Sequence, residues 1–493
     1  MICATAGLLV TACVQAPPRQ PPDAGLNPPA RWMAGAGAAA GPPEDESTWW
    51  TDLGDARLDG VIATALRENH DLGAAAARLE QAVAQARMTR ADLKPFLSGT
   101  FDFSRQRFNF IGFPIPGGFS RVLSTTSSRY DVGVDLGWDL DLWGRLRAGA
   151  RAALAEVGAS EADLYGARLS ISGEAARAWF AVVEASEQVA LARDTVASRR
   201  ILTEQIRARF ARGLRPAIEL RLAASNLAAA EALLAQRLQE KDGALRRLDL
   251  LMGRYPAASF LPAGEPPHLP RIPQPVPAAL PADLIARRPD LVGAERRLAA
   301  ADARAVAARR ALFPSLTLTG SGGTASNQLR DLVDGDFRVW SLLAGLTQPL
   351  FAGGKLRAGV HLADASVREA REQYVQTALT AYAQVEASLA AGTFLAEREA
   401  HETESARQLT AARRLAEERY AAGVGDYLTV LDSQTRELAT RGDVLRLRRL
   451  RLDNRIDLHL ALGGGFDIRT GRTGTGAPAP AAGDAGRSEG AGR

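Results

Sequence analysis

The sequence contains an internal duplication, which limits the folds that the chain can adopt. The stretch "NHDLGAAAARLEQAVAQARMTRADLKPFLSG" aligns with "RPDLVGAERRLAAADARAVAARRALFPSLTLTG". Asp71 corresponds to Asp290 and Pro95 to Pro314, and both pairs are 219 residues apart. Farther along, "GRLRAG" at 144–149 matches "GKLRAG" at 354–359, 210 residues later. A duplication of this size predicts the same order of elements twice in one chain.

Each half is expected to contain a helix, a strand pair, a long helix, a turn and a second helix. The first helix, over 71–93, is rich in alanine and ends before Pro95, where apolar alternation begins. No proline occurs from 144 to 212, and apolar residues recur every seven positions there, with one four-residue interruption. The recurring residues are Val157, Leu164, Ile171, Val182, Val189 and Val196. This repeat is typical of a coiled-coil seam and predicts a helix on the order of 100 Å long.

The segment "YDVGVDLGWDLDLWGRLRAG" predicts a long strand with two different faces. Apolar residues occupy every second position from Tyr130 to Leu142, and aspartate or glycine lies between them. A half-buried strand of a soluble sandwich gives the same alternation. However, the strand is long enough to cross a membrane, and each half offers only one hairpin, which is not stable alone in water. We therefore favour a membrane strand.

The acidic residues of this strand are the first candidate functional group. If the apolar face meets lipid, Asp131, Asp135, Asp139 and Asp141 line an aqueous lumen and favour cations. The alternative is that these aspartates form a solvated outer face. Trp138, Trp143 and Trp340 lie near strand ends, where they suit the aromatic girdle of a membrane barrel.

Four strands cannot close a barrel, because an open edge in lipid leaves backbone groups without hydrogen bonds. The chain is therefore expected to oligomerise. Two copies would supply eight strands and three copies twelve, and the pattern does not choose between them. The long helices would continue the barrel on one side as a ring of coiled helices.

The ends of the chain differ from its body. Residues 1–12 form a short apolar run typical of an export signal, and "VTAC" resembles a bacterial lipobox that would make Cys13 an acylated N-terminus. An ordinary signal peptide cut near Ala12 is the alternative. Residues 13–46 are expected to be a tether, 47–256 and 283–466 the two repeats, 257–282 a proline-rich linker, and 467–493 a disordered tail.

Composition argues against several functional classes. The net charge is +4 without a basic patch, so no nucleic-acid partner is expected. The two cysteines and five histidines are scattered, so neither a metal site nor a cofactor is expected. The stretches "HETES" and "GSGGTAS" do not complete a zinc or phosphate motif, which argues against an enzyme with catalytic residues. No apolar run reaches about 18 residues, so no transmembrane helix is expected.

The chain resembles the outer-membrane factor family, the TolC-like channels, and in particular its NodT-type efflux lipoproteins. The resemblance covers about 49–466 and includes "IARRPDLVGAERRLAAADA", "QPLFAGGKLRAGV", "RYAAGVGDYLTVLDSQ" and "ALGGGF". It implies a mixed α+β membrane protein: a homotrimer with a twelve-stranded barrel in the outer membrane and a long helical tunnel in the periplasm. It also implies the exit duct of a tripartite efflux system for small molecules such as drugs. The partners would be a periplasmic adaptor and an inner-membrane transporter, often of the resistance-nodulation-division type.

The resemblance also implies roles for residues at the helix turns. The adaptor-docking tips correspond to Gly213, Leu214 and Arg215 in the first half and to Gly423, Val424 and Gly425 in the second. Glycine at these positions also suits the turn alone. The acidic residues at the periplasmic gate correspond to Asp432, with Asp426 nearby, whereas Thr429 stands at a second position that is acidic in some relatives.

Two other functions remain open at this point. Within the same family, the chain could serve as the exit duct of a type I protein secretion system. A periplasmic coiled-coil scaffold would explain the heptads, but it has no use for strands with a lipid-compatible face.

Overall fold

The computed structural model describes residues 15, 31–34, 46–110, 123–260, 267–272 and 284–464. The expected export signal, Cys13, most of the tether and the tail over 467–493 lie outside the described residues. Acylation of Cys13 therefore remains a prediction.

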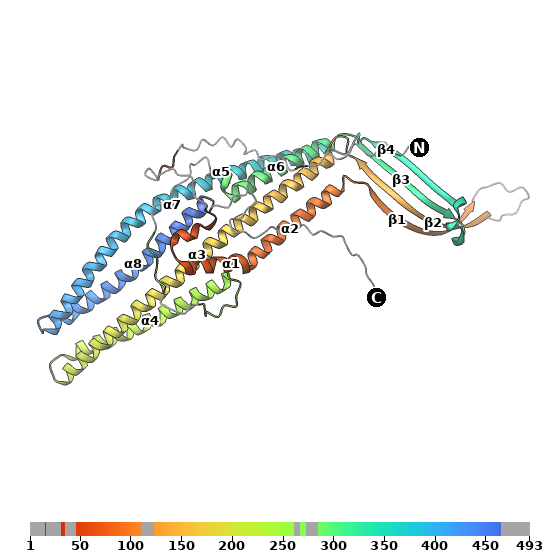
Figure 1. Cartoon of the computed structure of the whole chain (residues 1–493). Coiled ribbons are helices and arrows are strands. Elements are labelled where there is room, and N and C mark those ends of the chain that lie inside the picture. The colour runs from red at the N-terminus through yellow and green to blue at the C-terminus, as the bar shows by residue number, and fades with distance from the viewer. Residues whose placement is uncertain are drawn as a thin grey trace, which may run out of the picture. The chain divides into compact units, whose positions relative to one another are not determined.

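Helices and strands follow the same order in both parts of the chain (Figure 1). The first part contains η1 (Glu46–Leu53), α1 (Ala56–Glu68), α2 (His70–Ala91), β1 (Phe96–Phe110), β2 (Leu123–Leu140), α3 (Arg145–Ala211) and α4 (Ala217–Leu251). The second contains α5 (Leu284–Arg287), α6 (Pro289–Arg310), β3 (Ser315–Ser326), η3 (Leu329–Val333), η4 (Gly335–Phe337), β4 (Arg338–Thr347), α7 (Lys355–Ala421) and α8 (Tyr427–Ala461). Corresponding helices have equal lengths: 22 residues for α2 and α6, 67 for α3 and α7, and 35 for α4 and α8.

The chain divides into two compact units, and each takes segments from both halves of the sequence. The first unit, here the strand unit, includes Arg78–Ser160 and Ala294–Tyr374. The second, here the helical unit, includes Asp23–Ala77, Glu161–Gly293 and Val375–Arg493. The expected halves therefore describe the duplicated sequence and not the compact bodies, because the strands of both halves share one sheet.

The strand unit contains one four-stranded sheet in the order β1-β2-β3-β4, with every neighbouring pair antiparallel. The central pair, β2 and β3, joins the hairpin of one half to that of the other, so that Val132 lies opposite Thr324. Strand β2 has 18 residues and ends at Leu140, where the alternating pattern gives way to the turn before α3. No helix in the described part of the chain is long and apolar enough to cross a membrane.

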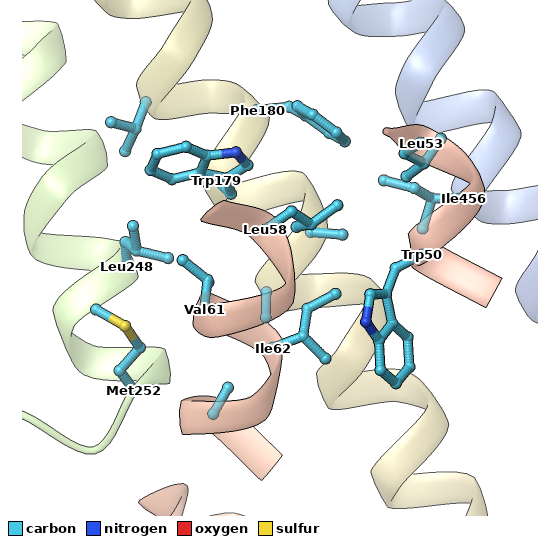
Figure 2. Packing of buried hydrophobic residues seen from close by; sticks show 14 of the residues in the cluster. Trp50, Leu53, Leu58, Val61, Ile62, Trp179, Phe180, Leu248, Met252 and Ile456 are labelled. Carbon is cyan, nitrogen blue, oxygen red and sulfur yellow. The ribbon is translucent and has the colours of Figure 1, made fainter. Parts of the chain in front are cut away.

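The core of the helical unit forms around α1, a helix that the sequence interpretation did not include. Asp55 caps α1 by accepting from the backbone N–H of Arg57 at 2.9 Å. Leu58, Val61, Ile62 and Ala65 follow at helical spacing and are fully buried. Figure 2 shows Val61 on the side of Leu248 and Met252, at the end of α4, and Ile62 on the side of Trp50; all belong to one cluster with Trp179 of α3. The cluster also includes Trp49 and Trp50 from η1.

The heptad positions of α3 are buried most completely in the helical unit. Ile171, Val182, Val189 and Val196 are buried there, whereas Val157 and Leu164 are half-buried. The seven-residue repeat therefore marks the packed side of α3 from Ile171 to Val196.

A short part of the expected tether lies against α7. The backbone N–H groups of Met33 and Ala34 both donate to the carboxylate of Glu386, each at 2.8 Å. Trp32 is buried, and its ring centroid lies 6.2 Å from that of Tyr382. This segment therefore has a defined docking position, which its proline-rich, weakly hydrophobic surroundings did not indicate.

Candidate functional site

One face of the sheet is apolar on all four strands. Alternate residues of a strand share a face, as do residues directly opposite on neighbouring strands. The register therefore groups Leu97, Phe101 and Phe103 of β1 with Val132, Val134 and Leu136 of β2, Leu316 and Leu318 of β3, and Trp340, Leu342 and Leu346 of β4. Phe101 is 61% exposed and Trp340 81% exposed. A continuous apolar surface of this kind marks contact with another apolar phase or partner.

The opposite face of the sheet carries the predicted aspartates. Asp131, Asp135 and Asp139 of β2 share this face with Ser98 and Thr100 of β1 and with Thr317, Thr319 and Ser321 of β3. The Thr100 hydroxyl donates to Asp135 and the Thr317 hydroxyl to Asp139, both at 3.0 Å. Asp131 is paired with Arg129 at 2.8 Å. Apolar and polar residues are separated less strictly on the outer strands β1 and β4, where Phe108 and Leu343 lie on the polar face.

Asp141 has different surroundings from the other three aspartates. It lies one residue beyond β2, and its carboxylate accepts from the backbone N–H groups of Leu146 and Arg147, both at 2.9 Å. The Arg147 side chain also contacts this carboxylate at 3.2 Å, and only 9% of the Asp141 side chain is exposed. Asp141 thus accepts hydrogen bonds from the free backbone N–H groups in the first turn of α3. It does not belong to the row of aspartates on the polar face of β2.

Two of the three tryptophans expected in the interfacial girdle use their indole N–H inside the chain. Trp138 donates to the Leu93 carbonyl at 3.1 Å, and Trp143 donates to the Pro314 carbonyl at 2.8 Å. These bonds tie the end of β2 to the connections that precede β1 and β3. Trp340 of β4 instead stands on the exposed apolar face.

The expected docking tips are turns between paired helices in the helical unit. Gly213 and Gly423 have φ of 72° and 81°, which only glycine adopts readily. The next residue closes each helix: Leu214 N–H donates to Arg209 O at 2.9 Å, and Val424 N–H donates to Arg419 O at 3.1 Å. Leu214 and Val424 are 66% and 70% exposed, so each tip presents an aliphatic side chain to its surroundings.

The two remaining tip residues, Arg215 and Gly425, are half-buried. A Cβ on Gly425 would lie 2.8 Å from the backbone nitrogen of Tyr420, so this position requires glycine. The Arg215 guanidinium lies 4.5 Å from the ring centroid of Tyr420 and 3.6 Å from Glu219. Arg215 therefore contributes to a contact between the two helix pairs, α3–α4 and α7–α8.

Tyr420 lies at the centre of this contact between the helix pairs. The sequence analysis did not identify Tyr420 as a functional residue. The Tyr420 hydroxyl donates to Glu219 at 2.8 Å, and the ring packs in a cluster with Ile206, Ala223 and Tyr427. Burial, reinforced by the bond to Glu219, raises the pKa of Tyr420 to about 12, so the hydroxyl keeps its proton at neutral pH. The duplication contained a signal: Phe210 corresponds to Tyr420 in the first half, so only the second half carries the hydroxyl.

The predicted gate residues lie on the exposed side of α8. Asp426 is exposed at the N-cap position and its side chain makes no capping bond. Asp432 is exposed and pairs with Arg436 on the next turn of the same helix at 2.9 Å. The negative charge of Asp432 therefore has a cation beside it within its own helix.

Comparison with known proteins agrees with this architecture. The family model described as "Outer membrane efflux protein" matches residues 61–254 and 280–464. OprJ, an outer membrane protein of Pseudomonas aeruginosa, is 34% identical over 462 residues, which cover 93% of this chain and 94% of OprJ. SilC of Salmonella typhimurium, named a probable outer membrane lipoprotein, is 28% identical over 85% of this chain and 88% of its own length.

A solved structure gives the same result for the fold. The open state of the MtrE outer membrane channel of Neisseria gonorrhoeae superimposes with a TM-score of 0.78 at 29% identity, covering 92% of this chain and 98% of MtrE. Since the family model matches well over half of the sequence, the chain belongs to the outer membrane efflux protein family.

Proposed function

We propose that this chain is the outer-membrane exit duct of a tripartite efflux system and passively conducts small molecules such as drugs to the exterior. Membership of the family makes it an efflux protein of the outer membrane, and this family consists of channels and not of enzymes. The observation that supports the duct most directly is the sheet with one exposed apolar face and one polar face. A wall between lipid and water requires this arrangement.

The proposed duct is a homotrimer with a twelve-stranded barrel. Within the described chain, β1 and β4 each have a neighbouring strand on one side only. Backbone groups at an edge in lipid cost several kcal/mol each when unpaired, so β4 of one copy must pair with β1 of the next. Three copies supply twelve strands, and the duplicated long helices would extend the duct into the periplasm.

In this proposal, Asp131, Asp135 and Asp139 line the lumen. Asp131 is paired with Arg129, so Asp135 and Asp139 supply the negative potential that favours cations. The exposed tips at Leu214 and Val424 would dock a periplasmic adaptor, which connects the duct to an inner-membrane transporter of the resistance-nodulation-division type. Asp432 and Asp426 would narrow the periplasmic mouth. Contact between Tyr420 and Glu219 would hold the two helix pairs together while the mouth is closed.

Planar-bilayer recording of the purified full chain tests the proposal. We expect detergent-stable trimers that insert into the bilayer and give stepwise, cation-selective currents. A freely soluble monomer that requires neither lipid nor detergent would contradict it, and would favour the periplasmic scaffold.

A further inference from the structure

The strand unit contains a pocket of about 250 Å³ where β2 ends, α3 begins and α6 leads into β3. Its lining includes Leu140 and Leu316, which are the last pair on the apolar face between β2 and β3. Trp143 and Phe313 stack at the same pocket with ring centroids 5.4 Å apart. Arg145 and Arg310 also line it. The pocket thus combines an apolar wall with two guanidinium groups.

The balance of charge at this pocket is positive. Arg145 is exposed and makes no hydrogen bond or ion pair with any described residue, whereas Arg310 donates to the Gly144 carbonyl at 2.8 Å. Two carboxylates line the pocket as well. Asp141 is neutralised by Arg147, and Asp139 accepts from Thr317. The lining therefore contains two arginines, Arg145 and Arg310, and one aspartate without a cation partner, Asp139. The N-terminal end of α3 adds partial positive charge.

The apolar wall of the pocket continues along the sheet. From Leu140 and Leu316, the apolar face runs through Leu318 toward Gly320 and Gly322. The six steps from Leu316 to Gly322 span ~20 Å at ~3.4 Å each, which exceeds the ~15 Å of hydrocarbon in one leaflet. A molecule with its charged group in the pocket could therefore lay a hydrocarbon chain along this face.

We propose that the pocket binds the phosphate of a membrane glycerophospholipid, whose acyl chains lie along the apolar face of β2 and β3. Arginine presents several N–H donors in a planar fork that matches phosphate oxygens. Arg145 would supply the free donors, and Arg310 would hold the start of α3 in position through Gly144. This inference rests on the proposed function, because the chain meets such a lipid only if the sheet lies in a membrane.

Native mass spectrometry of the full chain in mild detergent tests this site with dipalmitoyl phosphatidylglycerol as the probe. Removing a charged hydrogen-bond donor costs ~1.5–3 kcal/mol, so Arg145→Gln should weaken binding about tenfold or more. Arg151→Gln is the matched control, because Arg151 is also exposed on α3 without a partner among the described residues, but does not line the pocket. Its binding should equal that of the parent protein.

A second pair of variants tests the path of the acyl chains. A side chain on Gly322 would meet no atom within 4 Å, so Gly322→Leu should fold and cover the apolar face beside the path. Gly345 has equally open surroundings but lies on the polar face, opposite Thr317. We expect Gly322→Leu to weaken lipid binding several-fold and Gly345→Leu to leave it unchanged.

Two further probes separate the sources of binding. Dipalmitoylglycerol lacks the phosphate and glycerol 3-phosphate lacks the chains, and both should bind much more weakly than the phospholipid. Equal binding of the phospholipid to parent and Arg145→Gln proteins would overturn the site, as would glycerol 3-phosphate binding as tightly as the lipid. Oligomeric state and conductance are measured on the same samples. A conducting trimer that fails the lipid test contradicts only this inference, whereas absence of a conducting oligomer contradicts the proposed function.

Discussion

At the scale of single residues, similar side chains have different roles because their partners differ. Asp139 and Asp141 are two positions apart in an unbroken acidic pattern, yet one accepts from Thr317 across the sheet and the other caps α3. Residues beyond the end of a strand no longer obey its alternation. Neutralising the two aspartates should therefore affect different properties.

We expect Asp139→Asn to reduce the cation preference of the channel without loss of thermal stability. Asp141→Ala should instead destabilise the protein by ~0.5–2 kcal/mol, which is typical for loss of an N-terminal cap, and leave ion selectivity nearly unchanged. Reversal potentials in salt gradients and thermal unfolding measure the two effects. A large shift in reversal potential for Asp141→Ala would assign this residue to the lumen.

A second residue-scale prediction concerns His459, which is buried against Trp49 with ring centroids 5.3 Å apart. Neither ring nitrogen has a hydrogen-bond partner among the described residues, and burial, with a smaller effect of Arg455, lowers the pKa of His459 to about 3. A lowered pKa means that the folded state binds fewer protons than the unfolded state. Stability is therefore present above the unfolded pKa of about 6.5 and is lost as the pH falls toward 3.

His459→Phe should keep the stacked ring and remove this acid sensitivity. We expect the variant to be more stable than the parent, with the difference growing by ~2 kcal/mol between pH 7 and pH 5. Denaturant unfolding at both pH values measures the change. A difference in stability that stays constant with pH would show that His459 does not become protonated on unfolding in this range.

At the scale of elements, the bonds within the α7–α8 pair differ from those that join this pair to α3–α4. Helices α7 and α8 are linked by a buried carboxylate: Glu437 accepts from Thr410 at 2.8 Å and pairs with Arg413 at 2.5 Å. A second bond joins Gln434 to Glu417 at 2.8 Å. Near the tips, α7 is linked to α4 by the bond from the Tyr420 hydroxyl to Glu219, beside the Arg215 guanidinium and an apolar cluster. Opening of the periplasmic mouth should therefore break the bond between Tyr420 and Glu219 and leave the α7–α8 pair intact.

Tyr420→Phe removes one hydroxyl and preserves the ring that packs between the tips. We expect a several-fold rise in the open probability of the channel in planar bilayers, because the closed arrangement loses a charge-assisted hydrogen bond of ~1.5–3 kcal/mol. Tyr255→Phe is the control, since Tyr255 is 87% exposed outside this cluster. Unchanged gating of Tyr420→Phe would remove this contact from the closing mechanism.

At the scale of the whole molecule, threefold symmetry would bring three copies of every tip residue around one axis. Each Asp432 in such a ring would lie beside its own Arg436. The net charge of the ring would therefore be the sum of three aspartates and three arginines. Asp432→Ala should raise the closed-state conductance or weaken block by cations, and Arg436→Ala should strengthen that block. Bilayer currents with added divalent cations measure both variants. If neither variant changes the currents, Asp432 is not part of the gate.

The acyl anchor also belongs to this scale. Cys13→Ser should abolish acylation. Pore formation should remain intact, because the barrel of the proposed assembly anchors the protein in the membrane by itself. Radiolabelled palmitate incorporation and bilayer recording measure these two outcomes. Complete loss of channel activity at normal expression would contradict a separate role for the anchor.

The sequence by itself determined the features that depend on spacing between near neighbours. Alternation showed which residues of β2 share a face, the seven-residue repeat marked the packed side of α3, and Gly213 and Gly423 located the helix ends. Each of these patterns can be recognised from residues that are close in the sequence, because strand and helix periods are local properties of the backbone.

Only the tertiary structure decided which distant residues meet. It paired Tyr420 with Glu219, 201 positions apart, directed Trp138 to the Leu93 carbonyl, and gathered Trp49, Trp50 and α1 into the helical core. It also ended the acidic row at Asp139 by using Asp141 as a cap. These outcomes depend on strand register and on packing between elements, which no local period encodes.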